Sequence, residues 1–168
     1  MFQNEKITDK LPSVSNLEFK SIHKKYLIVL LLNFFFIASI FFVGLFFLIQ
    51  KNLKNNIPEY TGYLYLFLGL FFSIVLLFLI LGFFNRKYAI REHDVSYKKG
   101  VLVHAITTVP FARIQHIELE ERPFSRLFKL ASLKIYTAGE SGGDLKINGL
   151  TKREAKKIKE FITHFINE

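Results

Sequence analysis

Two long apolar runs, YLIVLLLNFFFIASIFFVGLFFLI at Tyr26–Ile49 and LYLFLGLFFSIVLLFLILGFF at Leu64–Phe84, set the architecture of this chain. They contain 24 and 21 residues, and neither contains Lys, Arg, Asp, Glu or His. A helix of about 20 apolar residues is needed to cross the hydrocarbon core of a bilayer. Helices of water-soluble domains are usually shorter and apolar on one face only. We therefore predict membrane-spanning helices at 26–49 and 64–84.

The charges that flank the two runs predict the orientation of the chain. The positive-inside rule places segments rich in Lys and Arg on the cytoplasmic side. Basic residues precede the first run and follow the second, at Lys20, Lys24, Lys25, Arg86, Lys87 and Arg91. The connection at 50–63 has only two lysines, opposed by one glutamate. We therefore expect a cytoplasmic tail at 1–25, a short extracytoplasmic loop at 50–63 and a cytoplasmic domain at 85–168.

Few polar groups lie within the two runs. Gly69 and Ser73 form a small-xxx-small pair, which lets another helix approach closely. Asn33 is placed to hydrogen-bond to the second helix or to a neighbouring subunit. Ionisable groups, which proton and ion pathways usually require inside the membrane, are absent from both runs. Asn33, Gly69 and Ser73 are therefore predicted packing positions, and an accessory role in a transport complex is only an alternative.

The composition narrows the function classes further. The chain has no Cys, which excludes disulfides, thiolate metal sites and thiol nucleophiles. The net charge of +9 is spread along the sequence, with no basic stripe interleaved with stacking aromatics, so nucleic acid is not an expected partner. The five histidines show no metal-ligand spacing. We expect no cofactor and no metal.

The hydrophobic pattern changes its period after Phe84. Short segments rich in Val, Ile, Tyr and Thr alternate with turn signals, which is typical of antiparallel strands. The expected strands are Tyr88–Ile90, Val95–Tyr97, Val101–Thr108, Ile114–Glu120, Leu133–Thr137 and Leu145–Ile147. Lys99-Gly100 and Gly139–Gly143 are predicted turns.

The last segment predicts one amphipathic helix at 152–166. Thr151 and Glu154 form a capping box, in which each side chain can satisfy a backbone N–H at the helix start. Apolar residues recur at three- and four-residue spacing, at Ala155, Ile158, Phe161, Ile162 and Phe165. The fold class is therefore an α+β membrane protein, with a two-helix hairpin, a strand-rich domain and a closing C-terminal helix.

Four short motifs in this domain carry a family resemblance. They are VPFARIQHI at 109–117, RPFSRLF at 122–128, LASL at 130–133 and YTAG at 136–139. Together with the preceding spans and the terminal helix, they resemble the bacterial pleckstrin-homology (PH) family of YdbS-like membrane proteins. Lys129 departs from the pattern, because relatives often carry Gly there. This departure bears on the conformation of the local turn and not on the fold.

The resemblance implies a strongly bent antiparallel sheet of about seven strands, closed by the C-terminal helix. It also implies a membrane-anchored interaction domain without enzymatic activity, often found beside a larger membrane protein that carries several such domains. The implied location is the bacterial cytoplasmic membrane.

Six residues of the motifs are candidate interaction or structural positions: Pro110, Arg113, Ile114, Gln115, Pro123 and Arg126. Two interpretations stay open. In the structural one, Arg113 pairs with an acid and Gln115 satisfies backbone groups at a strand start. In the functional one, this segment presents a docking surface to another PH-like domain.

Lipid and hydrolase chemistry are the main rival expectations. Candidate contacts to anionic lipid head groups are Arg86, Lys87, Lys98 and Lys99. Phosphoinositide binding is disfavoured, because the loop at 91–94, which corresponds to the ligand loop of eukaryotic PH domains, carries two acids. The segment at 139–143 matches G-x-S-x-G around Ser141, but a strand is expected after it where the hydrolase motif needs a helix.

The leading expectation is a non-enzymatic membrane scaffold that assembles with itself or with a larger multi-domain PH-like membrane protein. The expected partners are membrane lipids and another copy or a paralogue. The alternatives are a sensor of anionic lipid surfaces at the inner leaflet and an accessory subunit of a membrane transport complex.

Overall fold

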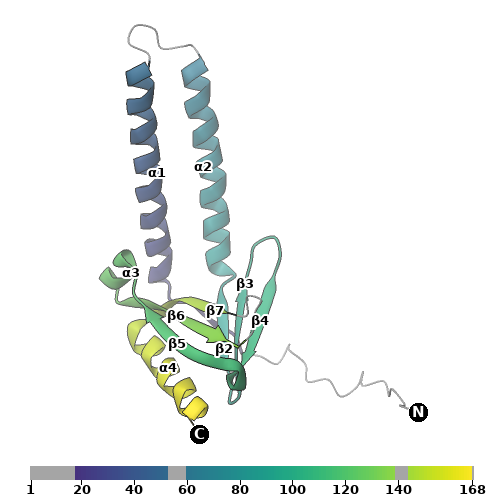
Figure 1. Ribbon diagram of the computed structural model, residues 1–168. Coiled ribbons are helices and arrows are strands. Elements are labelled where there is room, and N and C mark those ends of the chain that lie inside the picture. Colours follow the sequence, from purple (N-terminus) through teal and green to yellow (C-terminus); the bar gives the residue numbers. More distant parts are fainter. Residues whose placement is uncertain (1–17, 53–59, 139–143, 168) are drawn as a thin grey trace, which may run out of the picture.

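The computed structural model describes residues 18–52, 60–138 and 144–167, and it has the shape of a helical hairpin standing on a small domain (Figure 1). The hairpin consists of α1 (Lys25–Asn52) and α2 (Tyr60–Phe84). Both helices extend beyond the predicted spans by a few residues at one or both ends. The domain contains two antiparallel sheets, and a final helix lies under them, on the side away from the hairpin.

Aromatic contacts join the two helices of the hairpin. The Phe72 ring of α2 lies 5.9 Å from Phe34 and 5.3 Å from Phe42 of α1, and Phe42 stacks on Tyr65 at 6.4 Å. Most other side chains of the hairpin point outward and are exposed. An apolar surface this large and continuous is unfavourable in water, whereas it suits the hydrocarbon core of a bilayer.

The first sheet has the order β1-β2-β3-β4 and the second the order β5-β6-β7. The strands are β1 (Lys20–Ser21), β2 (Lys87–Ile90), β3 (Asp94–Lys99), β4 (Ala105–Pro110), β5 (Ile114–Glu120), β6 (Leu130–Thr137) and β7 (Leu145–Thr151). A 3-10 turn, η2 (Phe111–Arg113), leads from the first sheet into the second. Alternating residues of the strands, such as Val95, Leu133, Ile135 and Ile147, fill the core between the sheets.

Helix α4 (Lys152–Asn167) closes the core as the apolar stripe predicts. Ala155, Ile158 and Ile162 are buried against the sheets. At the far end, the Phe111 ring of η2 lies 6.0 Å from Phe161 and 5.6 Å from Phe165. The predicted fold class is confirmed: two apolar helices precede antiparallel strands, and one C-terminal helix follows them.

Residues 18–24, the N-terminal segment before α1, are part of the domain, which corrects for these residues the expectation of a separate tail at 1–25 and of a domain that begins at 85. Lys20 and Ser21 pair with Tyr88 and Lys87 of β2, and Ile22 is buried in the core. The His23 N–H donates to the Gly149 carbonyl of β7 at 2.8 Å. The segment therefore bridges the two sheets. A two-residue strand is too short to produce a recognisable period in the sequence.

Two local elements also differ from the expectation. The predicted strand at Val101–Thr108 begins only at Ala105, because the residues before it form the tip of the β3–β4 turn. A short helix, α3 (Pro123–Leu127), was not expected; Pro123 occupies its first turn, where the missing N–H costs nothing.

Lys129, which follows α3, has φ +56°, a left-handed conformation that glycine adopts more easily. The departure from the family pattern therefore falls on a position whose backbone favours Gly, and Lys occupies it without changing the fold.

The junction between hairpin and domain is tightly packed. The core includes Phe83 of α2, and Tyr26, Leu27 and Leu30 of α1 pack against it. Gly149 has φ +77°, and a Cβ built on it would lie only 2.7 Å from the Tyr26 ring. Only two residues separate α2 from β2. The hairpin and the domain therefore share one core, with no flexible linker between them.

We predict that Gly149→Ala destabilises the whole protein. The methyl group would overlap the Tyr26 ring, and alanine disfavours the left-handed backbone, so the free energy of unfolding should fall by about 3 kcal/mol. Chemical unfolding of the full chain in detergent measures this change. The matched control is Gly44→Ala in α1, where no atom lies within 4 Å of the added methyl group. Equal stability of the two variants would contradict the packing described here.

Candidate interaction surfaces

The six motif residues divide into buried and exposed groups. Ile114 is in the core, whereas Arg113, Gln115 and Arg126 are exposed. Pro110 ends β4 opposite Asp94, and Pro123 begins α3. The structure does not bring all six together into one site.

Arg113 and Gln115 do not make the contacts that the structural interpretation expects. Within the described ranges, neither side chain has a hydrogen bond or ion pair with another described residue. Instead, the Arg113 carbonyl accepts from the Ala138 N–H at 2.9 Å. The pairing register of β5 with β6 shifts between Ile114 and His116, so Gln115 lies in a bulge. Both side chains are therefore presented to the surroundings.

The polar residues of the hairpin are bonded within their own helices. Asn33 Nδ2 donates to the Val29 carbonyl at 2.7 Å, and Ser73 Oγ donates to the Gly69 carbonyl at 2.8 Å. A hydrogen bond from Asn33 to α2, which the sequence suggested, is not formed. No atom lies within 4 Å of a Cβ built on Gly69, so the small pair is not used to pack α1 against α2.

The four basic candidates also have different surroundings. Arg86 is half-buried at the junction, with its guanidinium 6.0 Å from the centre of the Tyr26 ring. Lys87 and Lys98 face each other across β2 and β3, and Lys99 follows at the exposed end of β3. Arg86 is therefore a junction residue, whereas Lys98 and Lys99 lie at the base of the β3–β4 turn.

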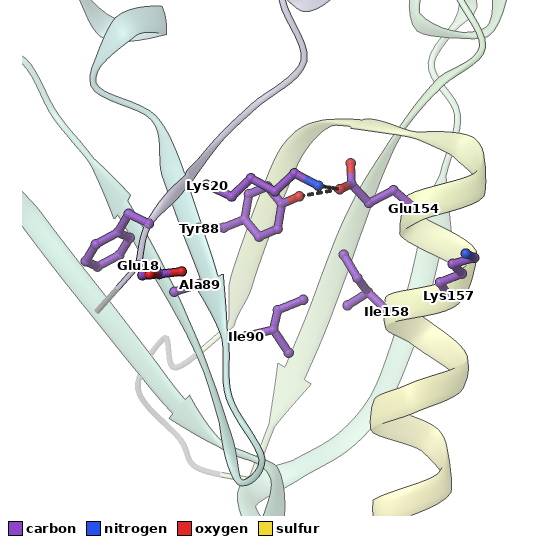
Figure 2. Close-up of a pocket in the computed structure, with 9 residues that line it drawn as sticks. Glu18, Lys20, Tyr88, Ala89, Ile90, Glu154, Lys157 and Ile158 are labelled. Carbon is purple, nitrogen blue, oxygen red and sulfur yellow. Dashed lines mark hydrogen bonds and ion pairs between the residues drawn. The ribbon is translucent and has the colours of Figure 1, made fainter. Parts of the chain in front are cut away.

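An open cleft of about 510 Å³ lies between β2 and α4 (Figure 2). At its upper end, Lys20 of β1 and Tyr88 of β2 converge on Glu154 of α4. The Tyr88 hydroxyl donates to Glu154 Oε1 at 2.6 Å, and Lys20 forms an ion pair with the same oxygen. Thr151 caps α4 as predicted, accepting from the Glu154 N–H at 3.2 Å. The Glu154 carboxylate, which the capping box would direct to the helix start, bonds to Tyr88 and Lys20 and so holds the N-terminal segment.

The surroundings of Glu154 shift two pKa values. Burial disfavours the carboxylate, but the hydrogen bonds from Lys20 and Tyr88 outweigh it and hold the pKa of Glu154 below its usual range. Burial and the bond to Glu154 raise the pKa of Tyr88 far above that of a free tyrosine. Both groups therefore keep one protonation state near neutral pH and serve as structural anchors.

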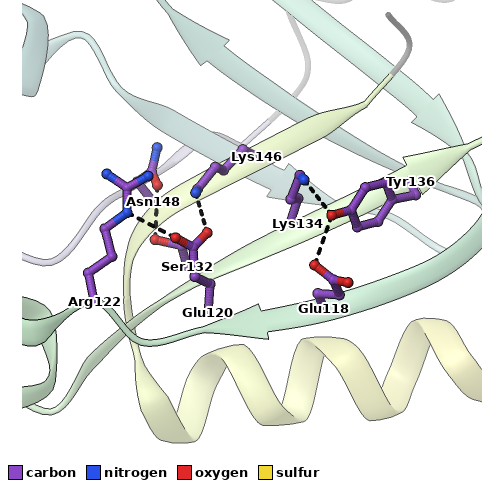
Figure 3. A network of polar contacts seen from close by, with 8 residues as sticks. All are labelled: Glu118, Glu120, Arg122, Ser132, Lys134, Tyr136, Lys146 and Asn148. Carbon is purple, nitrogen blue, oxygen red and sulfur yellow. Dashed lines mark hydrogen bonds and ion pairs between the residues drawn. The ribbon is translucent and has the colours of Figure 1, made fainter.

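A polar network covers the face of β5–β7 that lies opposite α4 (Figure 3). Arg122 Nε donates to Glu120 Oε1 at 3.0 Å, and Lys146 pairs with the other Glu120 oxygen. The bonds from Lys146 and Arg122 hold the pKa of Glu120 below its usual range. Glu120 therefore stays ionised, which does not suit a general acid at neutral pH.

The same network continues toward the far edge of the sheet. The Tyr136 hydroxyl donates to Glu118 Oε2 at 2.8 Å, and the His116 ring stacks on Tyr136 at 4.1 Å. Ser132 Oγ donates to Asn148 Oδ1 at 2.9 Å. These groups satisfy one another, as expected for a surface network, and they leave no activated nucleophile among the residues drawn in Figure 3.

A cavity of about 380 Å³ lies where the hairpin meets α3 and β6. Its polar wall contains Asn33, Arg122 and Ser132, and its apolar wall contains Phe34 and Phe72, among others. The cavity is amphipathic and sits at the level of the junction.

Sequence reasoning missed two exposed apolar groups on the domain. Leu102 and Val103, in the β3–β4 turn, are 84% and 77% exposed, and Leu127 of α3 is 74% exposed. Outside α1 and α2, these are the largest exposures of hydrophobic side chains in the described ranges. The sequence showed the turn signal Lys99-Gly100 and the proline at 123. It did not show that the apolar side chains beside them are exposed, because exposure depends on the fold.

No group of three or more His, Asp or Glu side chains in the described part of the chain is placed to hold a metal ion. The predicted turn at Gly139–Gly143, with the candidate nucleophile Ser141, lies outside the described residues.

The fold defines a class: a transmembrane helical hairpin that carries a two-sheet domain closed by a C-terminal helix. The family model described as "Bacterial PH domain" matches residues 28–166. The chain therefore belongs to the bacterial PH domain family, as the sequence motifs predicted.

Two individual proteins are similar to the chain. The UPF0699 transmembrane protein YdbS of Bacillus subtilis (strain 168) is 29% identical over 93 residues, which cover 54% of this chain and 57% of that protein. The chain thus matches a little over half the length of this relative. A crystal structure of a DUF1696 family protein with a pleckstrin-homology domain from Shewanella loihica PV-4 shows 19% identity and a TM-score of 0.37, covering 48% of this chain and 70% of that one.

We predict that Glu154→Ala loosens the N-terminal segment. Loss of the bonds to Lys20 and Tyr88 should lower the free energy of unfolding by about 1 kcal/mol, a small value because the Lys20 side chain is 68% exposed. Hydrogen–deuterium exchange of residues 18–23 in the full chain should become faster. Glu160→Ala, an exposed position in the same helix, is the control.

The pH dependence of this anchor follows from the lowered pKa of Glu154. Its contribution is fully present above about pH 4.5, the ordinary value, and is lost as the pH falls through the lower pKa of the folded state. Wild type should therefore lose protection of this segment on acidification, and Glu154→Ala should lose less. An equal loss in both proteins would rule out Glu154 as the anchor.

Proposed function

We propose that this protein is a non-enzymatic, membrane-anchored interaction protein that assembles with another copy or with a larger membrane protein carrying several PH-like domains. The observation that carries this proposal is the small-residue position on α2. Gly69 and Ser73 are left open by the hairpin, whose own contacts use Phe34, Phe42 and Phe72 instead. Small residues at a lipid-exposed position favour close packing of another transmembrane helix.

The edge of the first sheet supports assembly through the domain as well. Among the described strands, β4 pairs only with β3, so no described strand occupies its other edge, and most of its residues are exposed. An added strand can pair with such an edge. Arg113 and Gln115, which follow β4 and are exposed without partners among the described side chains, are placed to contact the same neighbour.

The orientation belongs to the same proposal. The domain lies in the cytoplasm and the hairpin in the bacterial cytoplasmic membrane, with both termini on the inner side. Supporting this are the basic residues on the domain side of the hairpin, such as Lys24, Lys25, Arg86 and Lys87.

Mass measurement of the full chain in a mild detergent or in nanodiscs tests the proposal. The wild type should form an oligomer or carry a co-purified membrane protein, and Gly69→Ile should dissociate it. Gly44→Ile, at another open glycine of the hairpin, should leave it assembled. A wild-type particle that is monomeric and without a co-purified membrane protein would overturn the proposal.

A second candidate, a sensor of anionic lipid surfaces, is favoured by Lys98 and Lys99 at the base of the exposed β3–β4 turn. Its test uses the full chain, because residues 85–168 alone lack Ile22 and Tyr26 of the core. In nanodiscs with anionic lipid, hydrogen–deuterium exchange of residues 98–104 should be slower than in neutral ones. Lys98→Ala together with Lys99→Ala should remove the difference. An accessory role in transport stays an untested alternative, and the Asn33 side chain on which it drew donates to the Val29 carbonyl of its own helix.

A further inference from the structure

The two most exposed apolar groups of the domain lie on the side of the hairpin. Figure 1 shows the β3–β4 turn rising beside the base of α2, and α3 lying beside the base of α1. The turn carries Leu102 and Val103, and α3 carries Leu127. The transmembrane hairpin is thus flanked on both sides by apolar tips whose side chains are exposed.

The β3–β4 turn is held against α2. A Cβ built on Gly82 of α2 would lie 3.3 Å from Val101 Cγ2, so the Val101 side chain packs on the helix. Gly100 has φ +120°, and a Cβ there would overlap the Val103 carbonyl, so the turn depends on glycine for its tight shape. The turn therefore holds Leu102 and Val103 in a fixed position beside α2.

Helix α3 is held against α1 in a similar way. The Phe124 ring lies 5.9 Å from the Phe36 ring. Phe36 is the twelfth residue of α1, roughly 16 Å along the helix from Lys25 at 1.5 Å per residue. An element that contacts Phe36 lies beside the apolar run and not below it. Leu127, one turn after Phe124, is exposed at that level.

We propose that the β3–β4 turn and α3 insert into the leaflet on the domain side of the membrane, so that Leu102, Val103 and Leu127 lie among the acyl chains. Continuity with the hairpin identifies the leaflet as the occupant. The two tips touch α1 at Phe36 and α2 at Gly82, and both contacts lie within the apolar runs. Phe36 and the neighbours of Gly82, Leu81 and Phe84, are exposed. Transfer of these side chains from water to acyl chains is favourable.

Basic residues next to each tip fit the same placement. Lys98 and Lys99 precede the turn, and Arg126 precedes Leu127. Lys99 and Arg126 are exposed and Lys98 is partly buried, and none of the three side chains has a hydrogen bond or ion pair within the described ranges. Such residues beside an inserted apolar tip lie at the level of the lipid phosphates. The domain is then fixed on the membrane at three points: the hairpin, the turn and α3.

Tryptophan fluorescence tests this proposal, because the chain has no Trp of its own. Leu102→Trp and Leu127→Trp are placed singly in the full chain and reconstituted into phosphatidylcholine vesicles with brominated acyl chains. Glu160→Trp, exposed on α4, is the matched control outside the membrane, and Phe67→Trp, exposed on α2, is the control within it. The substitutions keep or add exposed apolar groups, so the fold should tolerate them.

The expected result is a short-wavelength emission and strong bromine quenching for Leu102→Trp and Leu127→Trp, as for Phe67→Trp, with no quenching of Glu160→Trp. Long-wavelength emission without quenching at the two tips would overturn the proposal. Short-wavelength emission without quenching would also overturn it, because a second protein chain would then cover the tips. The proposed insertion does not require anionic lipid, so its outcome is independent of the test for anionic lipid. It also does not require a second chain, so it is independent of the assembly test.

Discussion

The contact between the Tyr26 ring and Gly149 is the constraint on which the rest of the structure depends. A side chain at 149 would displace the first turn of α1 from β7, and the backbone there is left-handed. Because this contact is so close, the start of the membrane helix is packed into the domain core, together with Leu27, Leu30 and Phe83. The hairpin is therefore not a tether but a structural part of the domain, and the position of the domain at the membrane surface follows from it.

The N-terminal segment completes this arrangement. Ser21 pairs with β2, His23 bonds to β7, and Lys20 pairs with Glu154 of α4, so a few residues connect both sheets and the closing helix. The chain pairs with the first sheet at β1, forms the helical hairpin and returns to the same sheet at β2, next to β1. Any force on the hairpin, from a partner helix at Gly69 for example, would reach the sheets directly through this junction.

Several carboxylates of the domain are used by the fold itself. Glu154, Glu120 and Glu118 each accept bonds from neighbouring side chains. The groups that remain open are of a different kind: the glycine position on α2, the edge of β4 with Arg113, and the apolar tips at Leu102 and Leu127. The proposals for assembly and for membrane insertion rest on these groups.

The amino-acid sequence was sufficient to predict the two helices, the strand-rich domain, the amphipathic α4 and the family, because the hydrophobic period and the local motifs can be read directly from the order of the residues. The sequence did not reveal β1, α3 or the exposed tips. It predicted that Arg86 contacts anionic lipid head groups and that Asn33 packs against another helix. The folded structure was needed to find these features, because the burial of a side chain and its contact partners depend on which distant segments of the chain meet. Tyr26 and Gly149 are 123 positions apart in the sequence, and no local pattern records that their contact joins the membrane hairpin to the domain.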